Sequence, residues 1–131
     1  MTGVAVGLHA ELTRQVGPTD TALSVGSGDL QVLATPRLLA WAEAATCAAV
    51  AAALDPQQTT VGTRVDFQHL RGSPVHQQVQ VTAQLVHVDG RVLRFDVTAR
   101  NADGGMVLAH GELTRVVVRR DRFMQGLTGS G

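Results

Sequence analysis

The chain has 131 residues with eleven basic and eleven acidic side chains, so its formal net charge is zero. A chain of this length fits one domain with a buried core, and the balanced charge excludes the basic surface that nucleic acid or an anionic membrane normally requires. Cys47 is the single cysteine, which excludes an internal disulfide, and the N-terminal residues lack a signal-peptide pattern, so we expect a cytoplasmic protein.

The first third of the chain predicts a strand and then a turn-rich segment. Apolar residues alternate loosely over residues 3–16, which indicates a first strand that ends near Gly17. The serine- and glycine-rich residues 24–29 follow as a turn region. Thr35 and Pro36 then form a typical helix start, with Thr35 expected as the N-cap and Pro36 at the first helical position.

The helix that begins there is expected to run to about Leu54, where Asp55 and Pro56 stop it. Residues 38–54 include nine alanines, and Glu43 is their only charged residue. A bilayer span needs about 20 strongly apolar residues, and this run has 17. The sequence therefore predicts a helix buried inside the protein and wrapped on every side by other elements.

Four further strands are expected, over about residues 59–70, 75–88, 91–101 and 106–119. Asp89 and Gly90 give a tight hairpin signal, and residues 102–105 predict a looser turn. The order of strand, long buried helix and antiparallel meander is that of an α+β hotdog fold, in which a curved antiparallel β-sheet wraps one central helix. We expect this single domain over residues 1–123 and a flexible C-terminal tail over 124–131.

The expected partners follow from the sheet edge and from the composition. A long apolar strand at the edge of a sheet invites pairing with another chain, so a homodimer is expected. Further pairing of dimers into a tetramer stays open. Three Phe and one Trp offer no surface for stacking bases, which again argues against a nucleic-acid partner.

Glu43 and His69 are the first candidates for chemistry. A carboxylate taken out of water costs several kcal/mol unless it has a partner, a shifted pKa or a task. On the strand after the helix, Val61, Val65, Phe67 and His69 share the face that is expected to point toward the helix. His69 is then either a satisfied inward histidine or, together with Glu43, a general acid/base unit in a desolvated pocket.

Thr35 has two compatible roles. Besides capping the helix, it lies where free N–H groups and a positive dipole end can hold a developing oxyanion. Thr35 and Glu43 are about 12 Å apart along one helix, so they do not meet within one chain. Either the substrate bridges them or an antiparallel partner helix supplies one of them.

These residues belong to a pattern: T-x7-E from Thr35 to Glu43, V-G-T-x5-H ending at His69, and V-x-G-R ending at Arg91. From about residue 35 to residue 123 the chain resembles the fluoroacetyl-CoA thioesterase-like group of hotdog thioesterases. The resemblance implies a homodimeric acyl-CoA thioesterase with no metal and no cofactor besides the CoA of its substrate. It also implies that Thr35 is the hydroxyl member of the site, Glu43 the nucleophile or water-activating base, and His69 the acid/base and orienting group.

Gly62 and Arg115 fall at positions that line the acyl pocket in this family. Their alternative roles are a strand glycine that permits close packing and a solvated arginine at a strand end. Residues 25–33, before the helix, contain no aromatic side chain, whereas the fluoroacetyl-specific member has an aromatic lid there. We therefore expect a different short or medium acyl group.

Two other functions fit the same fold. A hotdog enoyl-CoA hydratase would need a characteristic Asp and His pair that we do not find, and a non-catalytic acyl-CoA or acyl-carrier binding module would keep the pocket without turnover. Cys47 is expected to be buried and inert. The basic run of Arg119, Arg120 and Arg122 is either a solvated chain end or a contact for the phosphates of CoA. The remaining histidines show no metal-ligand spacing: His9, His76, His87 and His110.

Overall fold

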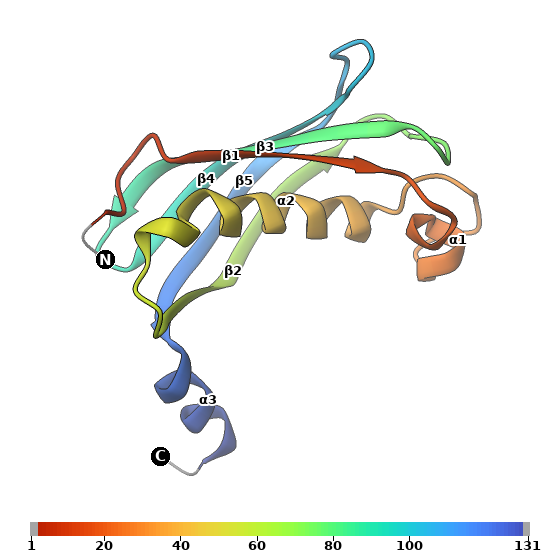
Figure 1. The fold of residues 1–131 in the computed structure, drawn as a ribbon. Coiled ribbons are helices and arrows are strands. Elements are labelled where there is room, and N and C mark those ends of the chain that lie inside the picture. The colour runs from red at the N-terminus through yellow and green to blue at the C-terminus, as the bar shows by residue number, and fades with distance from the viewer. Residues whose placement is uncertain (1–2, 130–131) are drawn as a thin grey trace.

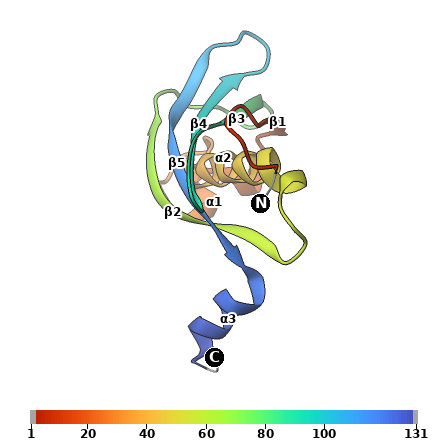
Figure 2. The same ribbon diagram turned by 90° about the vertical axis from the view of Figure 1, so that its left-hand side faces the viewer.

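The computed structural model describes residues 3–129, which form five strands and three α-helices. The strands are β1 His9–Gln15, β2 Gln58–His69, β3 Gln78–Asp89, β4 Val92–Asn101 and β5 Val107–Arg119. The helices are α1 Ala22–Val25, α2 Thr35–Val50 and α3 Arg120–Thr128, with short 3-10 turns at Pro18–Asp20 and Ala51–Ala53. The sheet is antiparallel throughout, in the order β1-β3-β4-β5-β2. It curves around α2 (Figures 1 and 2), which confirms the predicted α+β hotdog fold.

The core lies between the concave face of the sheet and α2. In the central strands every second residue is buried, as expected when one face of an antiparallel sheet packs against a helix. The side chains concerned are Val79, Val81, Ala83 and Leu85 of β3 and Leu93, Phe95, Val97 and Ala99 of β4. Burying each of the larger ones contributes about 2 kcal/mol. The site described below is therefore mounted on a rigid helix and sheet.

Helix α2 differs from the expectation at its start and on one face. Ala34 has extended backbone angles and is the N-cap, so Thr35 is the first helical residue and not the cap. The buried face carries Leu38, Trp41, Ala42, Ala45, Thr46, Ala49 and Val50. The opposite face is open in the single chain, where Ala40, Cys47 and Ala48 are exposed. The predictions of a helix wrapped on every side and of a buried Cys47 are thus wrong for one chain.

The segment before α2 also differs from its prediction. Strand β1 is shorter than expected and begins at His9. The turn region contains α1, whose first turn is capped by the side chain of Thr21, which accepts a hydrogen bond from the Ser24 N–H. Isolated bridges from Thr21 to Leu33 and from Val32 to Pro74 hold this segment against the body. Local capping chemistry thus gave a short helix that apolar periodicity did not reveal.

Strand β2 is an edge of the sheet and contains a bulge. Its register with β5 shifts between Gly62 and Arg64, and one extra residue in a strand reverses the faces that follow it. Before the bulge, Thr60 faces α2; after it, Phe67 and His69 do. The predicted inward direction of His69 agrees with the structure, but the expectation that Val61 shares its face is wrong because the bulge separates them.

Helix α3 follows β5 directly and projects away from the sheet (Figures 1 and 2). Residues 124–128, expected to belong to a flexible tail, lie in this helix. The first two residues of the predicted domain and the last two of the predicted tail fall outside the described residues. Within residues 3–129, no helix is long and apolar enough to cross a membrane.

Candidate active site

Thr35 and His69 meet at one end of α2. A hydrogen bond of 2.8 Å joins Thr35 Oγ1 to His69 Nδ1. The contact is possible because Thr35 opens the helix and does not cap it, so its hydroxyl is free of the backbone, while His69 ends β2 on the inward face. A hollow of about 190 Å³ adjoins the pair and is lined by Ser27, Leu33, Leu70 and Gly72 among others. A small group of a ligand can therefore approach both side chains.

Burial lowers the pKa of His69 below its ordinary value of 6.5, and a hydrogen bond with the Arg71 backbone raises it in part. Desolvation disfavours the charged imidazolium, which accounts for the direction of the main effect. The ring is consequently neutral near pH 7. A neutral ring can accept the hydroxyl proton of Thr35 at Nδ1, so the pair is suited to general acid/base chemistry.

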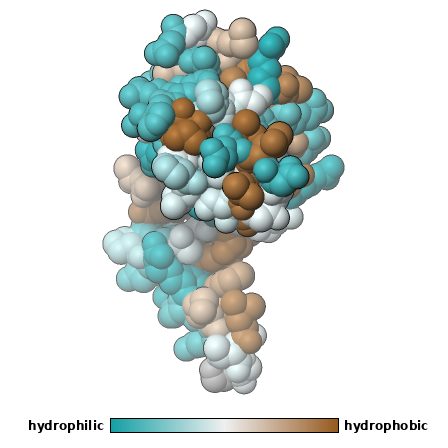
Figure 3. All heavy atoms as spheres, turned by 90° about the vertical axis from the view of Figure 1, so that its right-hand side faces the viewer, coloured by the Kyte–Doolittle hydropathy of each residue, from teal (hydrophilic) through white to brown (hydrophobic). Residues whose placement is uncertain are grey.

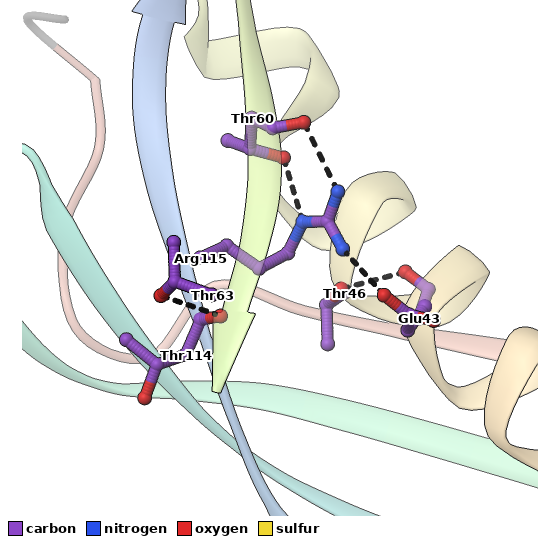
Figure 4. Close-up of polar contacts among 6 residues, drawn as sticks. All are labelled: Glu43, Thr46, Thr60, Thr63, Thr114 and Arg115. Atoms are coloured by element: carbon purple, nitrogen blue, oxygen red, sulfur yellow. Dashed lines mark hydrogen bonds and ion pairs between the residues drawn. The ribbon is translucent and has the colours of Figure 1, made fainter. Parts of the chain in front are cut away.

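Glu43 lies in a second cluster, together with Arg115 and Thr60 (Figure 4). Arg115 Nη1 donates to Glu43 Oε2 over 3.2 Å and forms an ion pair with it. The other nitrogens of the guanidinium bind Thr60: Nε donates to Thr60 Oγ1 at 2.8 Å and Nη2 to the Thr60 carbonyl oxygen at 3.0 Å. The arginine side chain is 9% exposed and that of Glu43 is 39% exposed. The carboxylate is thus held by a buried cation but keeps an open side.

Gly62 provides the space in which the Glu43 carboxylate lies. A Cβ atom at Gly62 would stand 2.9 Å from Glu43 Oε2 and 3.4 Å from Arg115 Nη1. Real Cβ atoms almost never approach another atom to within 3.0 Å, so any side chain here would displace the carboxylate. The close-packing role expected for this glycine and its place beside the site therefore coincide.

The two clusters are separate within one chain. Across residues 3–129, no hydrogen bond or ion pair joins Glu43 to Thr35 or His69. Gly62, which lies against Glu43, is seven residues from His69 along β2, and this separation corresponds to about 23 Å in an extended strand. The structure therefore joins Thr35 with His69 and Glu43 with Arg115.

Sequence reasoning missed Arg115 as the partner of Glu43 and Thr60 as the partner of Arg115. Arg115 is 7% exposed and is not a solvated strand-end arginine. Its position was readable from the alternation of β5, because Leu113 and Val117 on either side of it face the core. Thr60 gave no such signal, since threonine is common on any strand.

The other residues considered from sequence lie outside these clusters. Arg119 pairs with Asp121, Arg120 Nε donates to the Pro56 carbonyl oxygen, and Arg122 borders a surface hollow with Arg91. In the described part of the chain, no three His, Cys, Asp or Glu side chains lie close enough together to hold a metal ion.

Comparison with known proteins adds independent information. The model of the fluoroacetyl-CoA-specific thioesterase family matches residues 16–121. The fluoroacetyl-CoA thioesterase of Streptantibioticus cattleyicolor is 32% identical over 93 residues, which cover 71% of this chain and 66% of that protein. The solved structure of the fluoroacetyl-CoA thioesterase FlK superposes with a TM-score of 0.88 at 26% identity, covering 98% of each chain.

A Thermus thermophilus member of the thioesterase superfamily has the same fold, with a TM-score of 0.89 at 21% identity over 98% of this chain and 93% of that one. The family match extends over both clusters described above, from Thr35 through His69 to Arg115. The chain belongs to the fluoroacetyl-CoA-specific thioesterase family.

Proposed function

We propose that the protein hydrolyses a short or medium acyl-CoA to the free acid and CoA, with Thr35, Glu43 and His69 as its catalytic residues. The observation that carries the proposal is the pairing of a hydroxyl with a neutral imidazole at one end of α2 and a carboxylate held by Arg115 further along the same helix. Family membership supports thioester hydrolysis as the reaction.

The chemistry divides between the two clusters. Glu43 attacks the thioester carbonyl directly or activates a water molecule, because its open side leaves the carboxylate accessible. In the tautomer whose Nδ1–H donates to Thr35 Oγ1, the Thr35 hydroxyl is free to donate to the oxyanion, together with the free N–H groups of the first turn of α2. His69 orients Thr35 and, as acid/base, can pass to the departing thiolate the proton released by the attacking water. A thiolate leaves readily, so the protein has mainly to position the reactants, and no metal or further cofactor is required.

We place the complete site at the interface of a homodimer. Strand β2 is the longer edge of the sheet, and Val65 on it is 47% exposed. Two copies of β2 paired antiparallel about a point between Thr63 and Arg64 set Gly62 opposite Val65 of the partner subunit. His69 of the partner subunit is then four residues further on, about 13 Å, against about 23 Å within one chain. Glu43 of one protomer would thus work with Thr35 and His69 of the other.

The acyl group is proposed from the surface around the Thr35–His69 hollow. Leu70 lines that hollow and is 54% exposed, and Leu23 and Leu30, joined by a backbone hydrogen bond, are exposed on the neighbouring segment. Figure 3 shows apolar side chains at this end of the molecule, interspersed with polar ones. Aliphatic side chains suit a short or medium acyl chain. The cytoplasm stays the predicted compartment, and tetramers remain compatible with the proposed dimer.

The decisive experiment measures free thiol release from a panel of acyl-CoAs by the wild type and by Glu43→Gln. The amide keeps the shape of the side chain but cannot act as base or nucleophile, so turnover should fall about a thousandfold or more while the fold and the dimer persist. Glu112→Gln is a matched control, because Glu112 is an exposed acid paired with Arg94 on the face of β5 opposite to that of Leu113 and Arg115. It should retain wild-type activity.

Other outcomes of the same panel assign other functions. Unchanged hydrolysis by Glu43→Gln would remove Glu43 from the mechanism. Loss of the enoyl absorbance without thiol release would indicate a hydratase. Binding of acyl-CoA without turnover would indicate a binding module.

A further inference from the structure

Thr60 holds the arginine that holds Glu43. We infer that Thr60 is a positioning residue for the thioesterase reaction, acting through Arg115 on the orientation of the Glu43 carboxylate; this inference rests on the function proposed above. Both oxygen atoms of Thr60 take part: Oγ1 accepts from Arg115 Nε at 2.8 Å and the carbonyl oxygen from Nη2 at 3.0 Å. The sequence analysis did not single out this threonine, and it does not touch the carboxylate itself.

The geometry of the guanidinium explains why these contacts matter. The group is planar and its donors have fixed directions, so two hydrogen bonds to one residue fix both the place and the tilt of the plane. Nη1, the nitrogen left over, then points at Glu43 Oε2 at 3.2 Å. If Thr60 released Nε, the plane could turn about the last bonds of the side chain. Nη1 would then leave the carboxylate.

Burial makes the two hydrogen bonds from Arg115 to Thr60 necessary. Thr60 is 8% exposed and Arg115 is 7% exposed, so water cannot replace a missing acceptor without entering the packed region. Glu43, by contrast, is 39% exposed in its side chain and has no other side-chain partner among the described residues. Arg115 is therefore what restrains the carboxylate against solvent, and Thr60 restrains Arg115.

Gly62 limits the remaining freedom of the carboxylate. The strand surface at Gly62 lies so close to Glu43 Oε2 that a single added carbon would come within 2.9 Å. The Glu43 carboxylate thus lies between the backbone of Gly62 and the Arg115 guanidinium, and Thr60 fixes the orientation of that guanidinium. Displacements of about 1 Å from the reactive geometry can cost a hundredfold in rate, so the tilt has kinetic consequences.

The test compares Thr60→Val, Thr60→Ser and the control Thr59→Val in the acyl-CoA thiol-release assay. Valine keeps the shape of threonine but removes the Oγ1 acceptor, whereas serine keeps the acceptor and loses one methyl group. Thr59 is the preceding residue, pairs with Val118, and forms no side-chain hydrogen bond in the described structure. Thr59→Val therefore measures the effect of replacing a threonine by valine on this strand when no hydrogen bond to Arg115 is lost.

Thr60→Val should lower kcat about tenfold with KM nearly unchanged, the loss expected when a hydrogen bond to a charged group is removed. Thr60→Ser should restore at least half of the wild-type kcat, and Thr59→Val should match the wild type. A purely structural role would instead lower the amount of folded protein and leave kcat per folded site unchanged, so circular dichroism and gel filtration accompany the kinetics. Equal kcat for the wild type and Thr60→Val would overturn the inference.

A second readout does not depend on turnover. The Arg115 Nε–H should give a resolved, slowly exchanging nuclear magnetic resonance signal in the wild type and in Thr60→Ser, and that signal should broaden or vanish in Thr60→Val. An unchanged signal in Thr60→Val would also overturn the inference. If the wild type releases no thiol, the proposed function fails. If Glu43→Gln hydrolyses acyl-CoA like the wild type, Glu43 leaves the mechanism and this inference fails with it. If only the Thr60 variants match the wild type, the inference fails alone.

Discussion

The two side-chain pairs that connect α2 with the sheet, Thr35–His69 to β2 and Glu43–Arg115 to β5, differ in charge, burial and support. Thr35 and His69 form one hydrogen bond beside an open hollow, and neither bears a charge near neutral pH. Glu43 and Arg115 form an ion pair on a buried scaffold, with two additional hydrogen bonds from Arg115 to Thr60. One pair is therefore accessible and adjustable, whereas the other is fixed.

This difference suits a division of labour. An imidazole that exchanges protons must be within reach of a ligand, which the hollow beside His69 allows. A carboxylate that attacks a thioester or activates water must be held in one direction, which a fixed cation provides. The helix sets the pairs eight residues apart, which is about 12 Å, so whether they cooperate depends on the assembly.

Mixing two inactive variants is the strongest way to test that cooperation. Glu43→Gln and His69→Ala should each be nearly inactive as homodimers. After equal mixing and subunit exchange, half of the dimers contain one of each, and one of their two sites keeps both residues if the site spans the interface. Activity should return to about a quarter of the wild-type value. The recovery is measured as thiol release after denaturation and refolding together.

Absence of any recovery in dimers shown to be mixed would place the working Glu43 and His69 in the same chain. Glu112→Gln mixed with His69→Ala is the matched control for dilution. In that mixture the Glu112→Gln subunits keep both Glu43 and His69, so the activity should come from the sites that these subunits complete.

Gly62→Ala tests the Glu43–Arg115 pair without altering the Thr35–His69 pair. The new methyl group would come within 2.9 Å of Glu43 Oε2, so the carboxylate must leave its present position. We expect thiol release to fall between about tenfold and a hundredfold. The Thr35–His69 pair should be unaffected, as judged by the His69 titration in nuclear magnetic resonance.

Gly104→Ala controls for the general effect of adding a methyl group, because no atom lies within 4 Å of the added carbon there. This variant should behave like the wild type. A fully active Gly62→Ala would show that the carboxylate tolerates displacement.

The pH dependence of stability tests the Thr35–His69 pair. We expect it to be the smallest of the three effects. Burial holds the pKa of folded His69 below 6.5, so the unfolded chain binds the proton more readily. The free energy of unfolding should therefore fall as pH drops from about 6.5 toward the folded-state pKa, and this contribution should level off below it. Thermal unfolding at pH 7 and pH 5 measures the difference.

His69→Gln should show a smaller loss of thermal stability over this range than the wild type. His110→Gln is the control, because His110 is exposed on β5. An equal loss in the wild type and in His69→Gln would contradict the assignment to His69.

Much of the fold could be predicted because each element has a local signature. The alanine-rich helix, the hairpin signal at Asp89 and Gly90 and the alternating strands are visible in single segments. The order of these elements was sufficient for the hotdog architecture. The isolation of Glu43 in apolar sequence also predicted that it would have a partner, which the structure shows to be Arg115.

The partners of the candidate residues could not be predicted in the same way. The contact between Glu43 and Arg115 joins residues 72 positions apart, and nothing local encodes it. Thr35 was expected to cap α2, but Ala34 is the N-cap and Thr35 is the first helical residue, which leaves its hydroxyl to His69. Helix boundaries are uncertain by one or two residues when read from local signals, and here one residue decides whether the Thr35 hydroxyl binds the helix backbone or His69.

The bulge in β2 has a consequence for how the protein can be altered. With its extra residue, one strand presents Gly62 and His69 on the same side although they differ in parity. Deleting a single residue there would restore a regular strand. Either Gly62 or His69 would then face the convex surface of the sheet. The bulge thus decides whether Gly62 and His69 can both face α2, as the proposed site requires.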